Sequence, residues 1–385
     1  MTTSYPLRQI EIDGFRGFRN FTLPDLGGVN VLVGGNNSGK TSVLEAISIL
    51  SSPIEPESWL KMIHLRDPGG IDESKMHSLR WCFHRAVPFD DTDDLVTAKC
   101  EFRVKGAFHL ERLIVDLKEF YGEPDESELN RLGRSMRAMN FDRSEIGWRG
   151  ADLTHESHWS QLIPDNVICP PVSLRIWNDL PAMRYAKARK FTPPGLVCEA
   201  LYPYSYQMNS LQVKKISRLK SSDGAESDVD LLRQFDPDVL DIDIRSNSGY
   251  RPAIYLSHRR LGNVPLSIFG DAMRRSVLLS STLSGLPPGG VLLLDEAEAG
   301  IHAGAQPEFF RWLITAAQQK QVQVFLTTHS LEAVDALLSG LPEAATEDSL
   351  VVFKLERDDQ QGVHAKRLAG DLLHRLRFNR GLDIR

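Results

Sequence analysis

The segment Gly34–Ser42 carries the clearest chemical signal in the chain. It reads GGNNSGKTS and contains the pattern G-x-x-x-x-G-K-T. An apolar, strand-like run at 29–33 precedes it, and a helix-like run at 42–47 follows it. Glycines let successive backbone N–H groups curl around a phosphate, and the positive end of a helix dipole adds to the attraction. The segment therefore predicts a loop that binds a nucleoside triphosphate.

Two side chains of this loop have specific expected tasks. Lys40 can reach the β- and γ-phosphates, and the hydroxyl of Thr41 can bind Mg²⁺. ATP and Mg²⁺ are therefore the expected ligands. The other loop residues expected to contact the nucleotide are Gly34, Asn36, Asn37, Ser38, Gly39 and Ser42.

A pair of carboxylates follows a second apolar run. Residues 291–294 are all Val or Leu, and Asp295 and Glu296 come directly after them. Such a run is typical of a strand buried on both faces of a parallel sheet, and these sheets bind ligands at the carboxyl ends of their strands. We expect Asp295 to hold Mg²⁺, directly or through water, and Glu296 to orient and deprotonate the attacking water. Together with the phosphate loop, the pair predicts an Mg²⁺-dependent ATPase.

A histidine lies at the end of another predicted strand. The run at 321–326 ends in Thr327, Thr328, His329 and Ser330. From a strand end, His329 can donate a hydrogen bond to the γ-phosphate. A plain surface-loop histidine is the alternative interpretation.

Residues 266–275 offer a second anion-binding arrangement. Ser267 provides a hydroxyl and Gly270 a bare backbone N–H, just before a helix expected from about Asp271. A chain with its own phosphate loop does not need a second cradle, but the segment becomes useful if it caps a γ-phosphate held by another subunit. A plain helix cap formed by Ser267 or Asp271 explains the local sequence equally well.

Taken in order, these motifs resemble the ABC-type ATPases of the SMC/RecF/OLD branch, over residues 1–115 and 200–385. Residues 14–19, GFRGFR, resemble the opening of that branch, where an arginine contacts the nucleotide, so Arg16 and Arg19 are the candidates. The resemblance also identifies a signature motif (266–275, with Ala272 where many relatives have glycine), a D-loop (298–302), a switch-histidine motif (327–330) and His84 as a candidate Q-loop residue.

The resemblance implies an α/β fold: an ABC-type P-loop ATPase head with a mixed or parallel central sheet, an antiparallel β subdomain and a helical insertion. We expect an N-terminal ATPase lobe at 1–119 with a β hairpin over 96–115, an insertion subdomain at 120–195 and a C-terminal ATPase lobe at 196–385. Residues 54–80 are expected to be irregular, and the acidic run 90–94 a solvated loop.

Within the branch, OLD-like ATPases without a fused TOPRIM nuclease are the nearest resemblance. Residues 211–244 and 350–385 resemble passages of that group, no heptad run forms a coiled-coil arm, and 331–385 is too short for a TOPRIM domain. This implies an ATPase subunit that forms an ATP-dependent head-to-head homodimer, or a higher homo-oligomer, through composite sites. It would control a separate effector, a TOPRIM or HNH nuclease, in an anti-phage defence complex. The alternative is a RecF/SMC-like DNA-repair ATPase that binds DNA.

Composition narrows the remaining choices. The net charge is −6 and the pI about 6.0, unlike a dedicated nucleic-acid binder, although the basic run Arg184–Lys190 keeps nucleic acid among the candidate partners. No apolar run is long enough to span a membrane. The four cysteines are scattered, which fits a reducing cytoplasm. A transporter ATPase and a non-catalytic ATP-binding scaffold are disfavoured by the GFRGFR opening and by Glu296, respectively.

Overall fold

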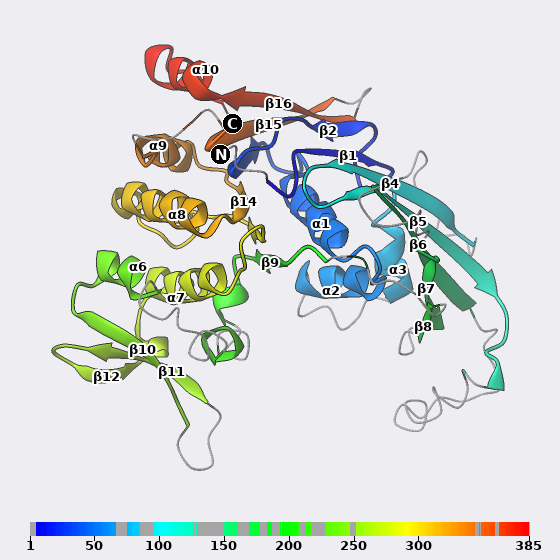
Figure 1. The fold of residues 1–385 in the computed structure, drawn as a ribbon, viewed down its shortest axis with the longest axis horizontal. Coiled ribbons are helices and arrows are strands. Elements are labelled where there is room, and N and C mark those ends of the chain that lie inside the picture. Colours follow the sequence, from blue (N-terminus) through cyan, green and yellow to red (C-terminus); the bar gives the residue numbers. More distant parts are fainter. Residues whose placement is uncertain are drawn as a thin grey trace.

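Three β-sheets organise the described part of the chain in the computed structural model (Figure 1). The structure describes residues 5–66, 75–84, 95–126, 128, 149–160, 169–177, 183–186, 193, 195–207, 213–217, 228–246, 252–342, 346, 348–358 and 362–384. Among these residues, no helix is both long and apolar enough to cross a bilayer.

The central sheet has six strands, of which five run parallel and the edge strand β16 runs antiparallel. The expected mixed or parallel central sheet is therefore confirmed. In spatial order its strands are β16 (Gly362–Ala369), β15 (Leu350–Asp358), β3 (Val29–Gly34), β14 (Gln323–Thr327), β13 (Val291–Leu294) and β9 (Cys198–Leu201).

Helices cover both faces of this sheet, which explains why its strands are apolar throughout. Leu32 of β3 packs into the same core as α1 (Lys40–Ser51). Its neighbours Val31 and Val33 face the opposite core. That second core contains residues of α7 (Asp271–Ser284), α8 (Gln306–Lys320) and α9 (Leu331–Ser339). Figure 1 shows α7, α8 and α9 on one side of the sheet and α1 on the other.

The second sheet is antiparallel and has seven strands. The expected hairpin over 96–115 is present as β4 and β5. The order is β2 (Phe21–Leu23), β1 (Gln9–Asp13), β4 (Thr97–Lys105), β5 (Leu110–Tyr121), β6 (Arg149–Trp159), β7 (Val172–Trp177) and β8 (Met183–Ala186).

Two expectations about secondary structure are wrong for the described residues. The segment 54–80 is not irregular, because α2 (Glu57–Arg66) and α3 (Lys75–Arg80) lie within it. Most described residues of 120–195 lie in strands and not in a helical insertion, although Glu126 and Glu128 are helical. The segment supplies β6, β7 and β8, because β5 continues to Tyr121 and pairs with β6 along its length. The division into lobes at 119 and 195 stays a prediction, and the runs 67–70 and 90–94 lie outside the described residues.

A third, three-stranded sheet lies directly before the signature-like segment 266–275 and packs against it. It consists of β10 (Val239–Arg245), β11 (Ala253–His258) and β12 (Gly262–Pro265), preceded by α6 (Asp228–Phe235). A 3₁₀ turn, η3 (Leu266–Ile268), then connects β12 to α7. Leu266, Met273 and Val277 pack against β10 and β11 in one small core. The predicted helix from about Asp271 is confirmed.

Candidate nucleotide-binding site

The phosphate loop lies between β3 and α1, and its glycines have clear steric reasons. Gly34 has φ 149°, and a Cβ there would lie 2.5 Å from the carbonyl oxygen of Leu355. Gly39 has φ 96°, and a Cβ would lie 3.0 Å from the ring of Phe18. Only glycine fits such positions without strain. Phe18 comes from the GFRGFR segment, so the two motifs pack against each other.

Lys40 is oriented toward the inside of the loop. Its Nζ donates hydrogen bonds of 2.8 Å to the carbonyl oxygens of Gly34 and Gly35. Burial lowers the pKa of Lys40, and the negative charges of Asp295, Glu296 and Glu298 oppose that shift. The loop therefore carries a partly desolvated ammonium group near three carboxylates. The ammonium group can attract a phosphate, and the carboxylates can attract the cation that accompanies it.

A buried hydroxyl in the same loop has no partner among the described residues. Ser38 is 5% exposed, and its Oγ makes no hydrogen bond there. Buried hydroxyl groups are nearly always hydrogen-bonded in native proteins. A phosphate oxygen in the loop would satisfy it, so the residues present fit a bound nucleotide.

The second half of the site meets the loop at the end of β13. The Thr41 hydroxyl lies 3.1 Å from Oδ2 and 3.2 Å from Oδ1 of Asp295. Strands β3, β14 and β13 are parallel neighbours, so their carboxyl ends lie side by side. A hydroxyl and a carboxylate are the hard oxygen ligands that Mg²⁺ prefers. Thr41 and Asp295 therefore fit the cation that was expected between them.

Glu296 has an unusual backbone held by two neighbours. Its φ is 49°, in the left-handed region that non-glycine residues rarely adopt. Its N–H donates to the Thr327 hydroxyl at 2.8 Å, and its carbonyl accepts from Arg275 Nη2 at 3.0 Å. Residues with such backbone strain cluster at functional sites. The strain supports the expected catalytic place of Glu296.

His329 follows β14, the strand between the phosphate loop and Asp295. Its side chain is exposed, and its backbone N–H donates to Glu298 Oε1 at 3.1 Å. Ser330 then caps α9 by accepting from the N–H of Ala333 at 3.1 Å. The topology brings His329 to the predicted edge, and its role toward the γ-phosphate stays a prediction.

The two arginines of the GFRGFR segment differ in their surroundings. Arg16 has φ 47°, and its Nε lies 2.6 Å from Oε2 of the buried Glu45 on α1. Arg19 is exposed. His84 donates its backbone N–H to the Gly14 carbonyl at 2.7 Å, so it lies beside the same segment. The structure thus ties Arg16 to the phosphate-loop helix, and the nucleotide contacts of Arg16 and Arg19 stay predictions.

Ser267 and Gly270 lie on the third sheet's side of the fold and are both exposed. Gly270 is the N-cap of α7 and has no side chain with which to cap it. The Asp271 side chain contacts Tyr206 and Arg274, and among the described residues no hydrogen bond from Ser267 or Asp271 makes the plain cap. The exposed end of α7 keeps its first N–H groups available to a ligand from outside.

Three residues near the site were not singled out from the sequence. Thr327 bridges Asp295 and Glu296, Glu45 holds Arg16, and Arg275 reaches from α7 to the carbonyls of Glu296 and Ala299. Of these, only Thr327 has a local signal, because it ends a predicted strand next to the one that carries Asp295.

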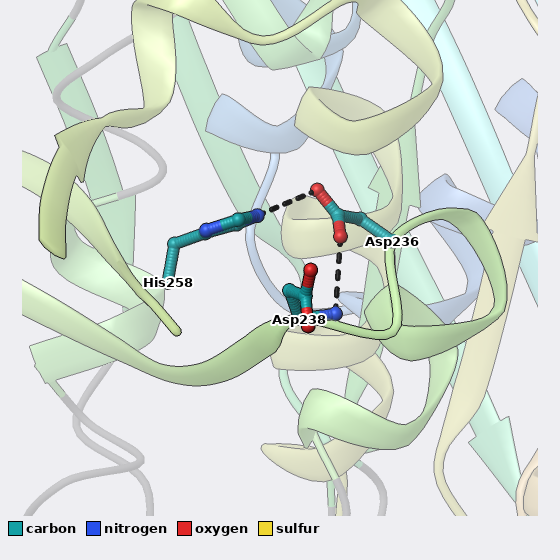
Figure 2. A group of neighbouring side chains, drawn as sticks. All are labelled: Asp236, Asp238 and His258. Carbon is teal, nitrogen blue, oxygen red and sulfur yellow. Dashed lines mark hydrogen bonds and ion pairs between the residues drawn. The ribbon is translucent and has the colours of Figure 1, made fainter. Parts of the chain in front are cut away.

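A separate group of metal-ligand side chains lies next to β11 (Figure 2). His258 Nδ1 accepts the N–H groups of Arg260 and Leu261, both at 3.2 Å. The ring proton is therefore on Nε2, which lies 3.1 Å from Asp236 Oδ2 and donates to it. Asp238 is paired with the Arg260 guanidinium. These partners already engage the ligand atoms within the protein, and the contacts stabilise the β11–β12 turn.

The chain is similar to several characterised proteins. Over 364 residues it is 25% identical to a Helicobacter pylori protein named ATP/GTP phosphatase, covering 92% of this chain and 93% of that protein. An SmcHead bound to the C-winged helix domain of ScpA aligns with 95% of this chain and 98% of its own, at 10% identity and a TM-score of 0.46. The recombination mediator protein RecF aligns with 96% of this chain and 100% of its own, at 14% identity and a TM-score of 0.42.

The assignment of the chain rests on a family model and not on these structural likenesses. The model described as "AAA domain, putative AbiEii toxin, Type IV TA system" matches residues 29–335. That span contains the phosphate loop, Asp295, Glu296 and His329. Because the match covers well over half of the chain, the protein belongs to this family and is a P-loop ATPase.

Proposed function

We propose that the chain hydrolyses ATP at the site formed by the phosphate loop and the end of β13. The observation that supports this most directly is the 3.1 Å contact between the Thr41 hydroxyl and Asp295. It joins two motifs that are 254 residues apart at one point. Thr41 and Asp295 would hold Mg²⁺ there, and the cation would supply positive charge that neutralises the charge of the transferred phosphate.

In this proposal each side chain has one task. Lys40 leaves the Gly34 and Gly35 carbonyls and pairs with the β- and γ-phosphates. Glu296 accepts a proton from the attacking water, and His329 donates to the γ-phosphate. Positioning and charge stabilisation account for most of the rate in phosphoryl transfer, so a site that is already assembled is well suited to it.

We further propose that the complete site needs a second copy of the chain. Ser267 and Gly270 are exposed at the start of α7, and the N-terminal end of a helix attracts anions. In a head-to-head dimer these residues would contact the γ-phosphate held by Lys40 of the partner. The exposed side chain of Ile268, at 72%, would become buried in the same contact.

Light scattering with and without ATP tests the dimer. A Glu296→Gln chain is the suitable sample, because bound ATP would persist. Its mass should double when ATP and Mg²⁺ are added and return to that of a monomer when ATP is removed. A constant monomer mass at saturating ATP would contradict the composite site while leaving ATP binding intact.

The proposed biological role rests on the resemblance to OLD-like ATPases and not on the geometry of the site. We propose an ATPase subunit that controls a separate effector, a TOPRIM or HNH nuclease, in an anti-phage defence complex. The support is the resemblance of residues 211–244 and 350–385 to OLD-like ATPases without a fused nuclease. Co-purification with the product of a neighbouring nuclease gene tests it. DNA or RNA cleavage by the purified chain alone would contradict a separate effector.

A DNA-repair ATPase is the alternative, and it needs a basic surface. Arg184 is the one residue of the run 184–190 whose side chain the structure describes. Its Nη2 donates to the Ile54 carbonyl at 2.9 Å, and its Nε lies 3.8 Å from Glu57. These contacts anchor β8 to the segment before α2 and do not favour a DNA contact for Arg184. ATP-stimulated binding of duplex DNA would favour the alternative.

A further inference from the structure

Thr327, the last residue of β14, makes two hydrogen bonds through a single hydroxyl. Its Oγ1 donates to Asp295 Oδ1 at 2.6 Å and accepts from the N–H of Glu296 at 2.8 Å. The directions are unambiguous, because a backbone N–H can only donate and an ionised carboxylate can only accept. Thr327 is 1% exposed, so both bonds are shielded from bulk water.

We propose that Thr327 is a positioning residue that sets the Mg²⁺-side carboxylate and the catalytic base relative to each other. This inference rests on the proposed ATP-hydrolysis site. Asp295 is held on one side by the Thr41 hydroxyl and on the other by Thr327. Two donors from different elements fix the plane of its carboxyl group. Such outer partners orient metal ligands and set their affinity.

The same hydroxyl also supports the strained backbone of Glu296. A left-handed φ of 49° is unfavourable for a non-glycine residue, so the surroundings must hold it in place. The bond from the Glu296 N–H anchors the first peptide of that turn to β14. Loss of the hydroxyl would free the carboxylate and the turn together, so one substitution should affect both Mg²⁺ affinity and turnover.

The bland interpretation is that Thr327 only satisfies a buried carboxylate and thereby stabilises the fold. The two interpretations differ in what they predict for substitutions. A purely structural hydroxyl changes the melting temperature and leaves the Mg²⁺ dependence unaffected. A positioning hydroxyl changes the Mg²⁺ concentration needed for half-maximal binding or rate, even in a well-folded variant.

The pair Thr327→Ser and Thr327→Ala isolates the hydroxyl, because the two variants differ in nothing else. Thr327→Val adds a variant of nearly wild-type shape. Ser281→Ala, at a buried serine of α7 whose Oγ donates to the Leu278 carbonyl at 3.1 Å, controls for loss of a buried hydrogen-bonded hydroxyl elsewhere. We expect Thr327→Ala and Thr327→Val to lose activity by roughly 10- to 100-fold, and Thr327→Ser to recover most of it.

A binding measurement separates this effect from turnover. In a Glu296→Gln background, calorimetry gives the affinity for ATP with Mg²⁺ and with EDTA. Thr327→Ala should weaken binding with Mg²⁺ by roughly tenfold or more and leave binding in EDTA unchanged. Equal Mg²⁺ dependence in the Ser and Ala variants would overturn the proposal, including when both melt at lower temperature.

The proposed function can fail separately. If Glu296→Gln alone hydrolyses ATP at the wild-type rate, the assignment of the base is wrong whatever Thr327 does. If Glu296→Gln stops turnover while Thr327→Ala and Thr327→Val match wild type, the site stands and the positioning role of Thr327 is refuted.

Discussion

The phosphate-loop half and the signature half of the proposed composite site differ in how far their residues are buried and hydrogen-bonded within one chain. In the first, Lys40 is 5% exposed and Asp295 9%, and both already hydrogen-bond to residues of the same chain. In the second, Ser267, Ile268 and Gly270 are exposed, and α7 has no side-chain cap. We infer that folding of one chain already positions the first half, here called the prepared half. The second half would be buried only on contact with a second chain, as in the proposed dimer.

The two halves are joined inside the chain by α7. Arg275 extends from that helix to the carbonyls of Glu296 and Ala299, and burial lowers the pKa of its guanidinium. The Arg275 side chain also lies over the ring of Tyr206, 5.9 Å from its centroid. The helix proposed to meet a partner's nucleotide therefore contacts the turn that carries Glu296, the proposed catalytic base.

The largest effect is expected on the prepared half. Glu296→Gln should lower turnover by more than about 100-fold, because a glutamine amide cannot accept the proton of the attacking water. ATP affinity should be preserved, because Glu296 does not hold the phosphates. Steady-state phosphate release and equilibrium ATP binding measure the two quantities. Glu308→Gln, at an exposed side chain on α8, is the matched control and should match wild type.

Lys40→Ala should weaken ATP binding by roughly tenfold or more, since it removes a charge-assisted contact worth about 1.5–3 kcal/mol. Calorimetry with ATP measures the loss. Lys99→Ala removes an equal charge at a 59% exposed side chain on β4 and should leave the affinity unchanged. An equal effect of both substitutions would mean that net charge, and not the loop, attracts the nucleotide.

The signature half should respond differently to substitution. Ser267→Arg should leave ATP binding to the monomer intact and reduce turnover roughly tenfold or more, because the new side chain would fill the space of the partner's γ-phosphate. Mixing the Ser267→Arg and Lys40→Ala chains confines both lesions to one site of a heterodimer. Turnover should then exceed that of either chain alone. A mixture no more active than its parts would refute the composite site.

How much could be predicted from sequence follows the same division. The phosphate loop, Asp295 and His329 lie at the ends of contiguous apolar runs, so local pattern located them. The Arg16–Glu45 ion pair spans 29 residues and depends on how the GFRGFR segment packs on α1, which no local pattern encodes. Likewise, the strands within 120–195 were missed because they form by hydrogen-bonding, one after another, onto the edge of β5, and the local sequence does not encode that pairing. Helix α2 was missed because it is only 10 residues long.

The last prediction concerns stability and not turnover, at a contact that supports α1 from the side of β6. His155 on β6 donates its Nδ1–H to the Pro53 carbonyl at 3.0 Å, just after α1. Its Nε2 is buried and has no partner among the described residues. Burial lowers the pKa of His155 from 6.5 to about 4. Protonation would place a charge at a site with no acceptor, so the folded protein favours the neutral ring.

The sign of the pH dependence follows from that shift. Between about pH 6.5 and pH 4 the unfolded chain binds a proton at His155 that the folded chain does not, so acid favours unfolding. The effect of His155 on the free energy of unfolding is constant above about pH 6.5. By about pH 5 the folded state has lost about 2 kcal/mol of stability through this residue. His155→Phe should melt lower at neutral pH but lose less stability on acidification than wild type. His158→Gln, at a 44% exposed ring on the same strand, should keep the wild-type pH dependence. Identical acid sensitivity of wild type and His155→Phe would show that other titratable groups determine acid unfolding. The His155–Pro53 contact would then not be the part of the fold that acid destabilises.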